Sequence, residues 1–159
     1  MYVAFLSLAV IHGDFNEQNI IVAERAQEKQ TTTDKFSVQS VIDFGDSHEA
    51  YYVMDVAIGI AYFMIGNNLT ASGVELGGHF LVGYQRHMVL TDAEFDALHI
   101  LVAGRLCQSL VLGAYSHAND PQNDYLLTTA KLGWPLLEKV WGLKKEDIYS
   151  VWRNVITSH

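Results

Sequence analysis

Two short segments carry side chains whose types and spacing could support phosphoryl transfer. In the first, residues 10–22, Asp14 lies five positions before Asn19 on an irregular stretch that leads into apolar residues. The second ends in Asp43, directly after the apolar pair Val41-Ile42. Phosphoryl transfer requires a carboxylate that accepts the proton of the attacking hydroxyl, and oxygen ligands for Mg²⁺ at the nucleotide phosphates. Asp14 is therefore the candidate base, and Asn19 and Asp43 are the candidate metal ligands.

Both segments match sequence patterns of kinases. The Asp14-x4-Asn19 spacing matches the catalytic loop, and Asp43-Phe44-Gly45 matches the metal-binding tripeptide. Each pattern alone could be an ordinary turn or helix cap, but their order, their apolar flanks and the helical pattern that follows make the combination specific. No Ala-Pro-Glu follows the tripeptide, and apolar helix sequence begins about ten residues later, which leaves no room for a long activation loop. We therefore expect a small-molecule acceptor.

Other polar residues near these segments have two interpretations. His12 is expected to be structural, holding the loop in shape through hydrogen bonds to the backbone, rather than a base or a metal ligand. Asp46, Glu49 and also Glu75 could bind an ammonium group of the acceptor, with ordinary surface acids as the alternative for each. The remaining histidines show no metal-ligand spacing; they are residues 48, 79, 87, 99, 117 and 159.

Composition limits the partners that this chain could bind. Its 159 residues are 50% hydrophobic and 18% charged, which is enough for one domain with a sizeable core. Ten basic against eighteen acidic residues give a net charge of -8, which disfavours nucleic acid and anionic membranes and favours a cationic or metal-bound ligand. Cys107 is the only cysteine, which excludes an internal disulfide and fits a cytoplasmic location.

The elements that position the candidate residues follow from hydrophobic periodicity. Residues 1–9 are apolar but too short to span a bilayer and lack a basic flank, so we expect a strand or helix end there, with a signal-like segment as the alternative. Strands at 20–22 and 36–42 are expected to form a hairpin around the polar connection 23–35. Predicted helices cover 56–65, capped by Asp55; 72–87, with capping-box spacing at Ser72; 91–116, with a capping box at Thr91; 122–141, kinked or divided by Pro135; and 146–156.

We therefore predict a helix-dominant α+β fold in a single domain, residues 1–159. Residues 10–46 form a catalytic loop and a metal-binding hairpin, and residues 55–159 form a helical subdomain. Glycines 77, 78 and 83 weaken the second helix and indicate close packing there.

Three motifs in this order identify a family resemblance. Residues 12–20 (HGDFNEQNI), 41–46 (VIDFGD) and 52–58 (YVMDVAI) resemble the aminoglycoside phosphotransferase and choline kinase superfamily. Within it, the sequence is most similar to the hydroxylysine kinases, to which residues 105–115 and 129–134 are also similar. The resemblance therefore extends from about residue 10 to the C-terminal region.

The resemblance implies a reaction and a set of roles. The reaction is phosphate transfer to the hydroxyl of 5-hydroxy-L-lysine, a small cationic amino acid, with Mg²⁺ as cofactor and GTP, or alternatively ATP, as donor. Asp14 would be the base and Asn19 and Asp43 the Mg²⁺ ligands. Ile21 and Ile42 would form the apolar floor beneath the nucleotide base. Asp55 would brace the catalytic loop.

The sequence departs from this family in one respect. Kinases of this kind also have an N-terminal lobe with a glycine-rich phosphate-covering loop and a lysine paired with a helix glutamate. The sequence starts eleven residues before His12 and has neither feature. We therefore expect a protein-kinase-like C-terminal lobe without its N-terminal lobe: a fragment, a short isoform or a truncated product. Such a chain would be weakly active or inactive alone, and would self-associate through the surface that the other lobe covers.

Two alternatives remain open at the level of sequence. The first is a related small-molecule kinase that acts on another amino alcohol or on an aminoglycoside. The second is a non-catalytic isoform that binds a partner.

Overall fold

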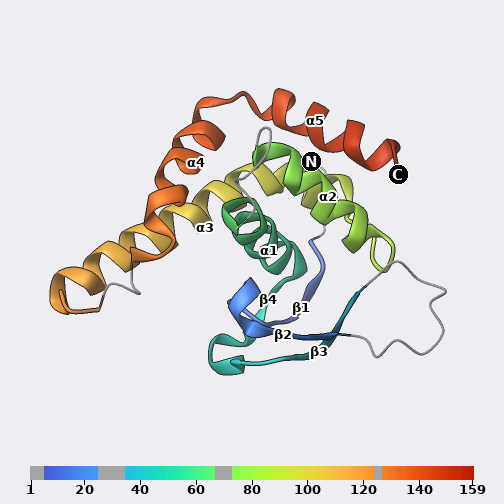
Figure 1. Ribbon diagram of the computed structural model, residues 1–159. Helices are drawn as coiled ribbons and strands as arrows, with labels where there is room; N and C mark the ends of the chain where they lie inside the picture. Colours follow the sequence, from blue (N-terminus) through green and yellow to red (C-terminus); the bar gives the residue numbers. More distant parts are fainter. Residues whose placement is uncertain (1–5, 25–34, 67–72, 124–126) are drawn as a thin grey trace.

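Two small antiparallel sheets lie beside a group of helices. The computed structural model describes residues 6–24, 35–66, 73–123 and 127–159. Strand β1 (Leu8–Ile11) pairs with β4 (His48–Tyr51), and β2 (Ile20–Glu24) pairs with β3 (Phe36–Val41). Figure 1 shows the four strands at one end of the molecule, with helix α1 (Tyr52–Gly66) between them and the other helices.

The predicted hairpin is confirmed. β2 and β3 are antiparallel, with Ile20 opposite Val41 and an irregularity in register between Ile21 and Val22. Ala23 and Glu24 extend β2, and residues 25–34 of the predicted connection lie outside the described residues. The strand or helix end predicted within residues 1–9 matches the start of strand β1, and residues 1–5 lie outside the described residues.

Strand β4 was not predicted, and it changes where the first helix begins. Its sequence, HEAY, lacks a run of apolar residues, but it pairs residue by residue with β1, from Ile11 opposite His48 to Leu8 opposite Tyr51. The N–H of Tyr52 donates to the carbonyl of Ser7 (3.0 Å), so the chain enters α1 directly from this pairing. The predicted start at residue 56 with Asp55 as the cap is therefore wrong: Asp55 lies in the first turn.

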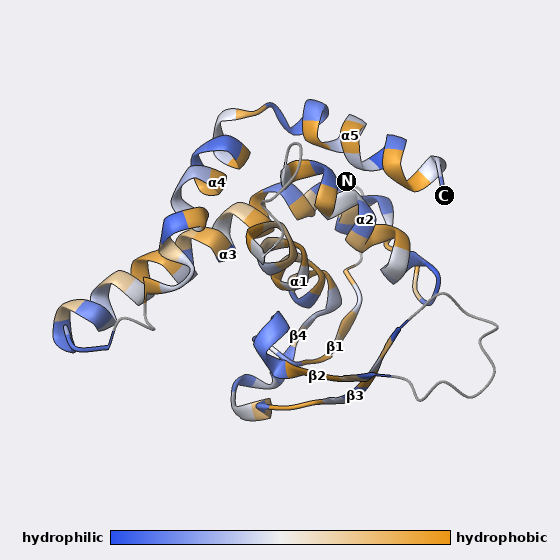
Figure 2. Cartoon of the chain, in the orientation of Figure 1, coloured by the Kyte–Doolittle hydropathy of each residue, from blue (hydrophilic) through white to orange (hydrophobic). Residues whose placement is uncertain are grey.

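Helix α1 is the centre of the core. It packs against α2 (Gly73–Gln85), α3 (Asp92–Asn119) and α4 (Ala130–Gly142). Nine of its fifteen residues are buried. Figure 2 shows the same helix as mostly hydrophobic around its circumference. The α+β architecture dominated by helices is confirmed.

Helix α3 begins at the predicted capping box. The hydroxyl of Thr91 accepts from the N–H of Glu94 (3.2 Å), and the Glu94 carboxylate accepts from the N–H of Thr91 (2.8 Å). The buried residues of α3 include Leu98, Val102 and Leu110. Among the described residues, α3 is the one helix long and apolar enough to cross a membrane; 28% of its apolar stretch is buried, and the helix packs along α1 and α4.

The predicted start of the fourth helix is wrong. Helix α4 begins at Ala130 rather than at residue 122, because the chain turns after α3: the N–H of Asn123 donates to the carbonyl of Asp120 (3.1 Å). Pro135 lies inside α4 without dividing it. The last helix, α5 (Lys145–Thr157), lies within one residue of its predicted bounds.

Close packing at two of the three glycines is confirmed. A Cβ added to Gly77 would lie 2.7 Å from the indole Nε1 of Trp152 on α5, and one added to Gly78 would lie 2.8 Å from Val155. A Cβ at Gly83 would meet nothing within 4 Å. The indole N–H of Trp152 donates to the carbonyl of Val74 (2.7 Å), which ties α5 to α2. Ser72, in the predicted capping box of α2, lies outside the described residues.

Candidate active site

The loop after β1 is held from beneath by a carboxylate of α1. Asp55 accepts two backbone hydrogen bonds, from the N–H of His12 (2.7 Å) and from the N–H of Gly13 (2.9 Å). Gly13 has a φ of +83°, in the left-handed region, and the backbone carbonyl of Asp46 fills the space where its Cβ would be. A side chain at position 13 would therefore be both strained and obstructed. The direction in which the chain leaves β1 is thus set by Asp55 and Gly13 together.

His12 connects the two candidate segments. Its Nε2 lies 2.9 Å from the carbonyl of Ile42, and its Nδ1 lies 3.3 Å from the N–H of Asp14. A carbonyl can only accept and a backbone N–H can only donate, so this pattern requires a neutral imidazole with its proton on Nε2. The ring is buried and lies 4.9 Å from the ring of Phe44. Both ring nitrogens of His12 therefore form hydrogen bonds with backbone groups.

Asn19 joins the candidate base to the second segment. Its side-chain Nδ2 donates to the carbonyl of Asp14 (3.0 Å) and lies 3.5 Å from the carboxylate Oδ2 of the same residue. Its own carbonyl accepts from the N–H of Ile42 (3.0 Å), the residue before Asp43. The structure therefore brings together the three residues that the sequence proposed for chemistry. Because Nδ2 faces Asp14, the side-chain Oδ1 of Asn19 is the atom that could bind a cation.

Asp43 presents an accessible carboxylate in an uncommon backbone conformation. Its φ and ψ are 62° and 65°, the only positive φ among the described non-glycine residues. Residues held in this region are concentrated at functional sites. The side chain is exposed and makes no capping hydrogen bond to the short helix Phe44–Asp46.

The oxygen atoms of Asn19 and Asp43 fit a Mg²⁺ ion that also binds phosphates. Mg²⁺ is usually held by one or two protein carboxylates or similar oxygens, and keeps phosphates and water as its other ligands. Within the described part of the chain, no three His, Cys, Asp or Glu side chains gather as a metal cage. The donor set thus suits an ion that arrives with a nucleotide better than a permanently bound metal.

Arg105 is a site residue that our sequence analysis did not assign. This side chain, near the middle of α3, forms an ion pair through Nη2 with Oδ1 of Asp14, ninety-one positions away in the chain. The pair is largely shielded, with 16% of the Arg105 side chain and 28% of the Asp14 side chain exposed. Arg105 is the only lysine or arginine of α3 and follows the apolar residues 100–104, which is a signal that could have found it, because a shielded charge needs a partner.

A second set of contacts holds the Arg105 guanidinium in place. Nη2 also donates to the hydroxyl of Tyr62 on α1 (3.1 Å), which donates in turn to the hydroxyl of Ser109 (3.1 Å). The guanidinium carbon lies 5.2 Å from the centre of the Tyr62 ring. Nη1 donates to the exposed side chain of Gln108 (3.2 Å), while the buried Nε has no partner among the described residues.

The residues predicted for the nucleotide and the acceptor lie close to this loop. Ile21 and Ile42 are 42% and 43% exposed, so both remain available to contact a ligand. The backbone of Asp46 packs on Gly13, and Glu49 on β4 lies opposite Val10 on β1. Both acidic side chains are exposed. Their assignments to the nucleotide base and to an ammonium group stay predictions.

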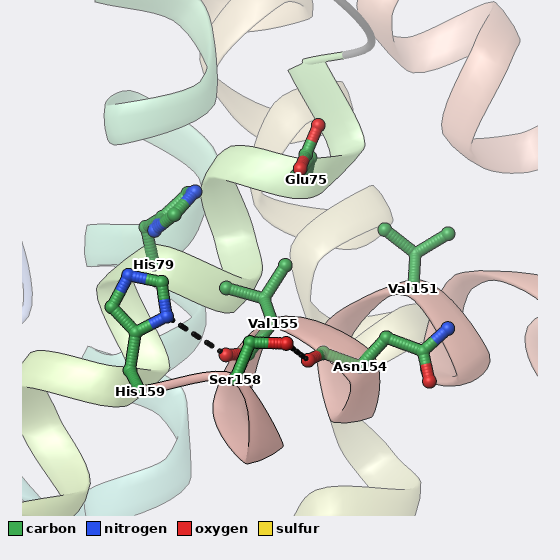
Figure 3. Close-up of a pocket in the computed structure, with 7 residues that line it drawn as sticks. All are labelled: Glu75, His79, Val151, Asn154, Val155, Ser158 and His159. Atoms are coloured by element: carbon green, nitrogen blue, oxygen red, sulfur yellow. Dashed lines mark hydrogen bonds between the residues drawn. The ribbon is translucent and has the colours of Figure 1, made fainter.

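Glu75 is placed elsewhere. It lies on α2 and, with residues of α5 and the C-terminal end, lines an open pocket of about 390 Å³. Figure 3 shows the side chains of this pocket, with His79 and His159 side by side at one end. Their ring centroids are 5.3 Å apart. None of the residues of the loop after β1 or of the segment that ends in Asp43 lines this pocket, so the structure does not place Glu75 with the candidate base.

The chain is similar to curated proteins named hydroxylysine kinase. It is 37% identical to the protein from Bos taurus and 38% identical to that from Xenopus laevis, in each case over 149 residues and 93% of this chain. The protein from Mus musculus is 36% identical over the same length. The chain spans about 38% of the length of these relatives. No protein-family model matches the sequence, and no solved structure matches it.

These matches confirm the resemblance to hydroxylysine kinases that the sequence motifs indicated. The similarity covers nearly the whole of this chain, including the loop around Asp14 and the helices, but only part of each relative.

Proposed function

We propose that this chain carries the catalytic loop and the metal-binding residues of a small-molecule kinase of the hydroxylysine kinase type. The substrate would be 5-hydroxy-L-lysine, and the donor GTP or, alternatively, ATP with Mg²⁺. The lobe would correspond to the C-terminal lobe of a protein-kinase-like fold. The relatives' name supports the substrate, and the sequence motifs support the reaction.

One observation supports this function most strongly. Asp14, Asn19 and the segment that ends in Asp43 form a single hydrogen-bonded unit, connected by the amide of Asn19, the carbonyl of Asn19 and the imidazole of His12. Two of these hydrogen bonds, at the Asn19 carbonyl and at the His12 imidazole, join the first segment to Ile42 of the second, and the third holds Asp14 within the first segment.

The chemistry follows from the atoms that this unit presents. Oδ2 of Asp14, the carboxylate oxygen that Arg105 does not bind, would accept a hydrogen bond from the acceptor hydroxyl and take its proton as the hydroxyl oxygen attacks the terminal phosphorus. The bond between that phosphorus and the nucleotide diphosphate then breaks. Asn19 and Asp43 would hold Mg²⁺, which supplies positive charge to the phosphate oxygens.

We expect slow transfer by this chain alone. A kinase binds its nucleotide between two lobes, and residues outside the matched 38% of the relatives would contribute to the pocket and to the clamping of the phosphates. Weak nucleotide binding is therefore part of the proposal for the 159-residue chain.

An assay of phosphate transfer with a panel of acceptors tests the proposed function. The chain is incubated at high concentration with Mg²⁺, GTP or ATP, and one of hydroxylysine, ethanolamine, choline or an aminoglycoside, and the phosphorylated acceptor is measured by mass spectrometry. We expect product with hydroxylysine and none with unhydroxylated lysine. Product with another acceptor only would assign the chain to a related kinase, and no product with any acceptor would contradict catalysis by this chain.

A second function is favoured by the exposed apolar side chains of the strands. Val10, Phe36 and Val38 are 74%, 55% and 64% exposed, which suits a surface that binds another protein. A non-catalytic binding role predicts no Mg²⁺-dependent nucleotide binding. Calorimetry with GTP, with and without Mg²⁺, separates the two functions, because binding that Asp43→Asn abolishes would favour the kinase.

A further inference from the structure

The Arg105 guanidinium lies beside the candidate base, Asp14. Oδ1 of Asp14 faces Arg105, whereas Oδ2 is the oxygen nearest the amide of Asn19, at 3.5 Å. The phosphates bind on the side of Asn19 and Asp43 in the proposed reaction. In the proposed reaction the acceptor hydroxyl binds Oδ2 of the same carboxylate, so the guanidinium lies close to the position of the acceptor.

The charge of Arg105 stands out against its surroundings. The other charged residues in and around the loop after β1 are acidic: Glu17, Asp43, Asp46, Glu49 and Asp55. Within the described residues the ion pairs are Arg105 with Asp14 and the exposed pair of Lys145 with Asp96. A site built only for a cationic acceptor would gain nothing from a guanidinium next to the base, because like charges repel.

One nitrogen of the Arg105 guanidinium donates to a partner that a ligand could replace. Nη2 is committed to Asp14 and Tyr62, but Nη1 donates to the exposed side chain of Gln108. An exposed hydrogen bond between a guanidinium and a neutral amide is weaker than one between a guanidinium and a carboxylate. An incoming carboxylate can therefore displace Gln108 from Nη1 while Nη2 keeps its contact with Asp14.

We propose that Arg105 binds the α-carboxylate of an amino-acid acceptor and so selects amino acids over amino alcohols and aminoglycosides. This inference rests on the proposed function and assigns the acceptor class. One guanidinium would bridge the acceptor's carboxylate and the base, which fixes the position of the hydroxyl relative to Asp14. Tyr62 and Ser109 hold the guanidinium for this purpose.

The test compares hydroxylysine with its carboxamide, which keeps the hydroxyl and both amines but lacks the negative charge. Affinity of the 159-residue chain for each compound is measured by calorimetry, and transfer to each is measured in parallel. Hydrogen bonds to charged groups contribute enough that we expect about tenfold tighter binding of the acid than of the amide. In Arg105→Gln this preference should disappear, through weaker binding of the acid only.

Two further variants make the test specific. Arg105→Lys keeps the positive charge without the fork of donors, and should retain part of the preference. Arg86→Gln removes an exposed positive charge elsewhere and should leave the preference unchanged. The comparison of acid with amide on the unmodified chain needs no variant, so it remains valid if Arg105→Gln does not fold.

Several outcomes would overturn the inference. Equal affinity of the unmodified chain for acid and amide, or no binding of either at millimolar concentration, excludes carboxylate recognition. An Arg105→Gln variant that slows transfer to both compounds equally, with unchanged affinities, would show that Arg105 acts only through Asp14. Loss of affinity for GTP alone would assign Arg105 to the phosphates. Binding that prefers the acid without any transfer would support the inference and contradict the proposed reaction.

Discussion

At the scale of single residues, Asp14 is held from three sides. Its backbone N–H faces His12, its carbonyl accepts from Asn19, and its carboxylate pairs with Arg105. A base whose orientation is set by neighbouring groups does not need to be ordered when the acceptor arrives, which is how positioning lowers the barrier to transfer. The contacts that orient Asp14 are thus the first targets for mutation.

His12→Phe tests whether the imidazole is a structural bridge. Phenylalanine keeps a planar ring but leaves the carbonyl of Ile42 and the N–H of Asp14 without their partner. We expect the free energy of unfolding to fall by about 1–3 kcal/mol, the usual cost of unsatisfied buried polar groups. Urea denaturation measures this loss, with His117→Phe, on the exposed end of α3, as the control. A change of less than about 0.5 kcal/mol, the usual size for a surface substitution, would contradict a bridging role.

The sequence predicted part of this site and missed the rest for a physical reason. The spacing of Asp14, Asn19 and Asp43 is local and marks the loop and the strand end directly. The partnership of Arg105 with Asp14 joins segments ninety-one positions apart, and it depends on how α3 packs against α1. No local pattern contains that information.

At the scale of elements, Glu94 links the start of the chain to the start of α3. Its buried carboxylate accepts from the backbone N–H groups of Ser7 (2.7 Å) and Thr91 (2.8 Å) and from the Thr91 hydroxyl (3.0 Å). Burial alone would raise the pKa of Glu94, but these hydrogen bonds more than offset it, so the pKa lies below its ordinary value of 4.5. The capping box of α3 therefore holds the charged carboxylate of Glu94 next to Ser7, the residue before β1.

Glu94→Gln should therefore have an effect that depends on pH. A carboxylate with a lowered pKa in the folded state contributes stability above about pH 4.5, and that contribution is lost as the pH falls through the folded pKa. We expect a loss of about 1–2 kcal/mol near neutral pH, shrinking in acid, by urea denaturation at a series of pH values. Asp92→Asn, an exposed change in the same turn, is the control. If the difference in free energy of unfolding between the unmodified chain and Glu94→Gln stays constant down to acidic pH, the lowered pKa of Glu94 does not contribute to stability.

The contact between α2 and α5 depends on the absence of a side chain at Gly77. Gly77→Ala would place a methyl group 2.7 Å from the Trp152 indole, whose position is also fixed by its bond to Val74. We expect a loss of about 1–3 kcal/mol from this overpacking. Gly83→Ala, on the same helix with open space around it, should be neutral or stabilising by up to about 1 kcal/mol. Thermal unfolding that ranks the two variants in the opposite order would contradict the packing.

The helices that were predicted well share a local signal. α3 and α5 begin where acidic or capping residues precede apolar periodicity, and both begin within one residue of the predicted position. β4 is short and polar, and it exists because β1 provides a partner. Asp55 is of a residue type that often caps helices, but its carboxylate accepts a hydrogen bond from the loop after β1. Helix α1 therefore begins earlier, at Tyr52. These differences arise wherever a tertiary contact competes with a local preference.

At the scale of the whole molecule, the strands carry apolar side chains that the described residues leave uncovered. Figure 1 shows both sheets at the end of the molecule opposite α5, and Figure 2 shows hydrophobic segments along β1, β2 and β3. The exposed large apolar residues of β1, β2 and β3 are Leu8, Val10, Ile21, Val22, Phe36 and Val38. A surface of this kind promotes association.

We predict that the chain associates with itself through these strands. In sedimentation velocity across a concentration series, the unmodified chain should shift toward larger species as its concentration rises. Replacing Val10 and Val38 with serine should move that shift to higher concentrations, because it removes exposed apolar area from the strands. Ile100→Ser, which changes an exposed apolar residue of α3, is the control. A chain that is monomeric throughout the series, or a control with an equal effect, would contradict the prediction.

The central claim is that Asp14 is the base of a phosphotransferase, and one measurement tests it most directly. Phosphorylation of hydroxylysine with Mg²⁺ and GTP is compared for the unmodified protein, Asp14→Asn and Asp96→Asn. Asp96 is the control, because its exposed carboxylate pairs with Lys145 and is remote from the loop in sequence. We predict a fall of about 100-fold or more in Asp14→Asn, the usual contribution of a positioned base, with Asp96→Asn unchanged. Near-normal transfer by Asp14→Asn, in a variant shown to be folded, would contradict the account.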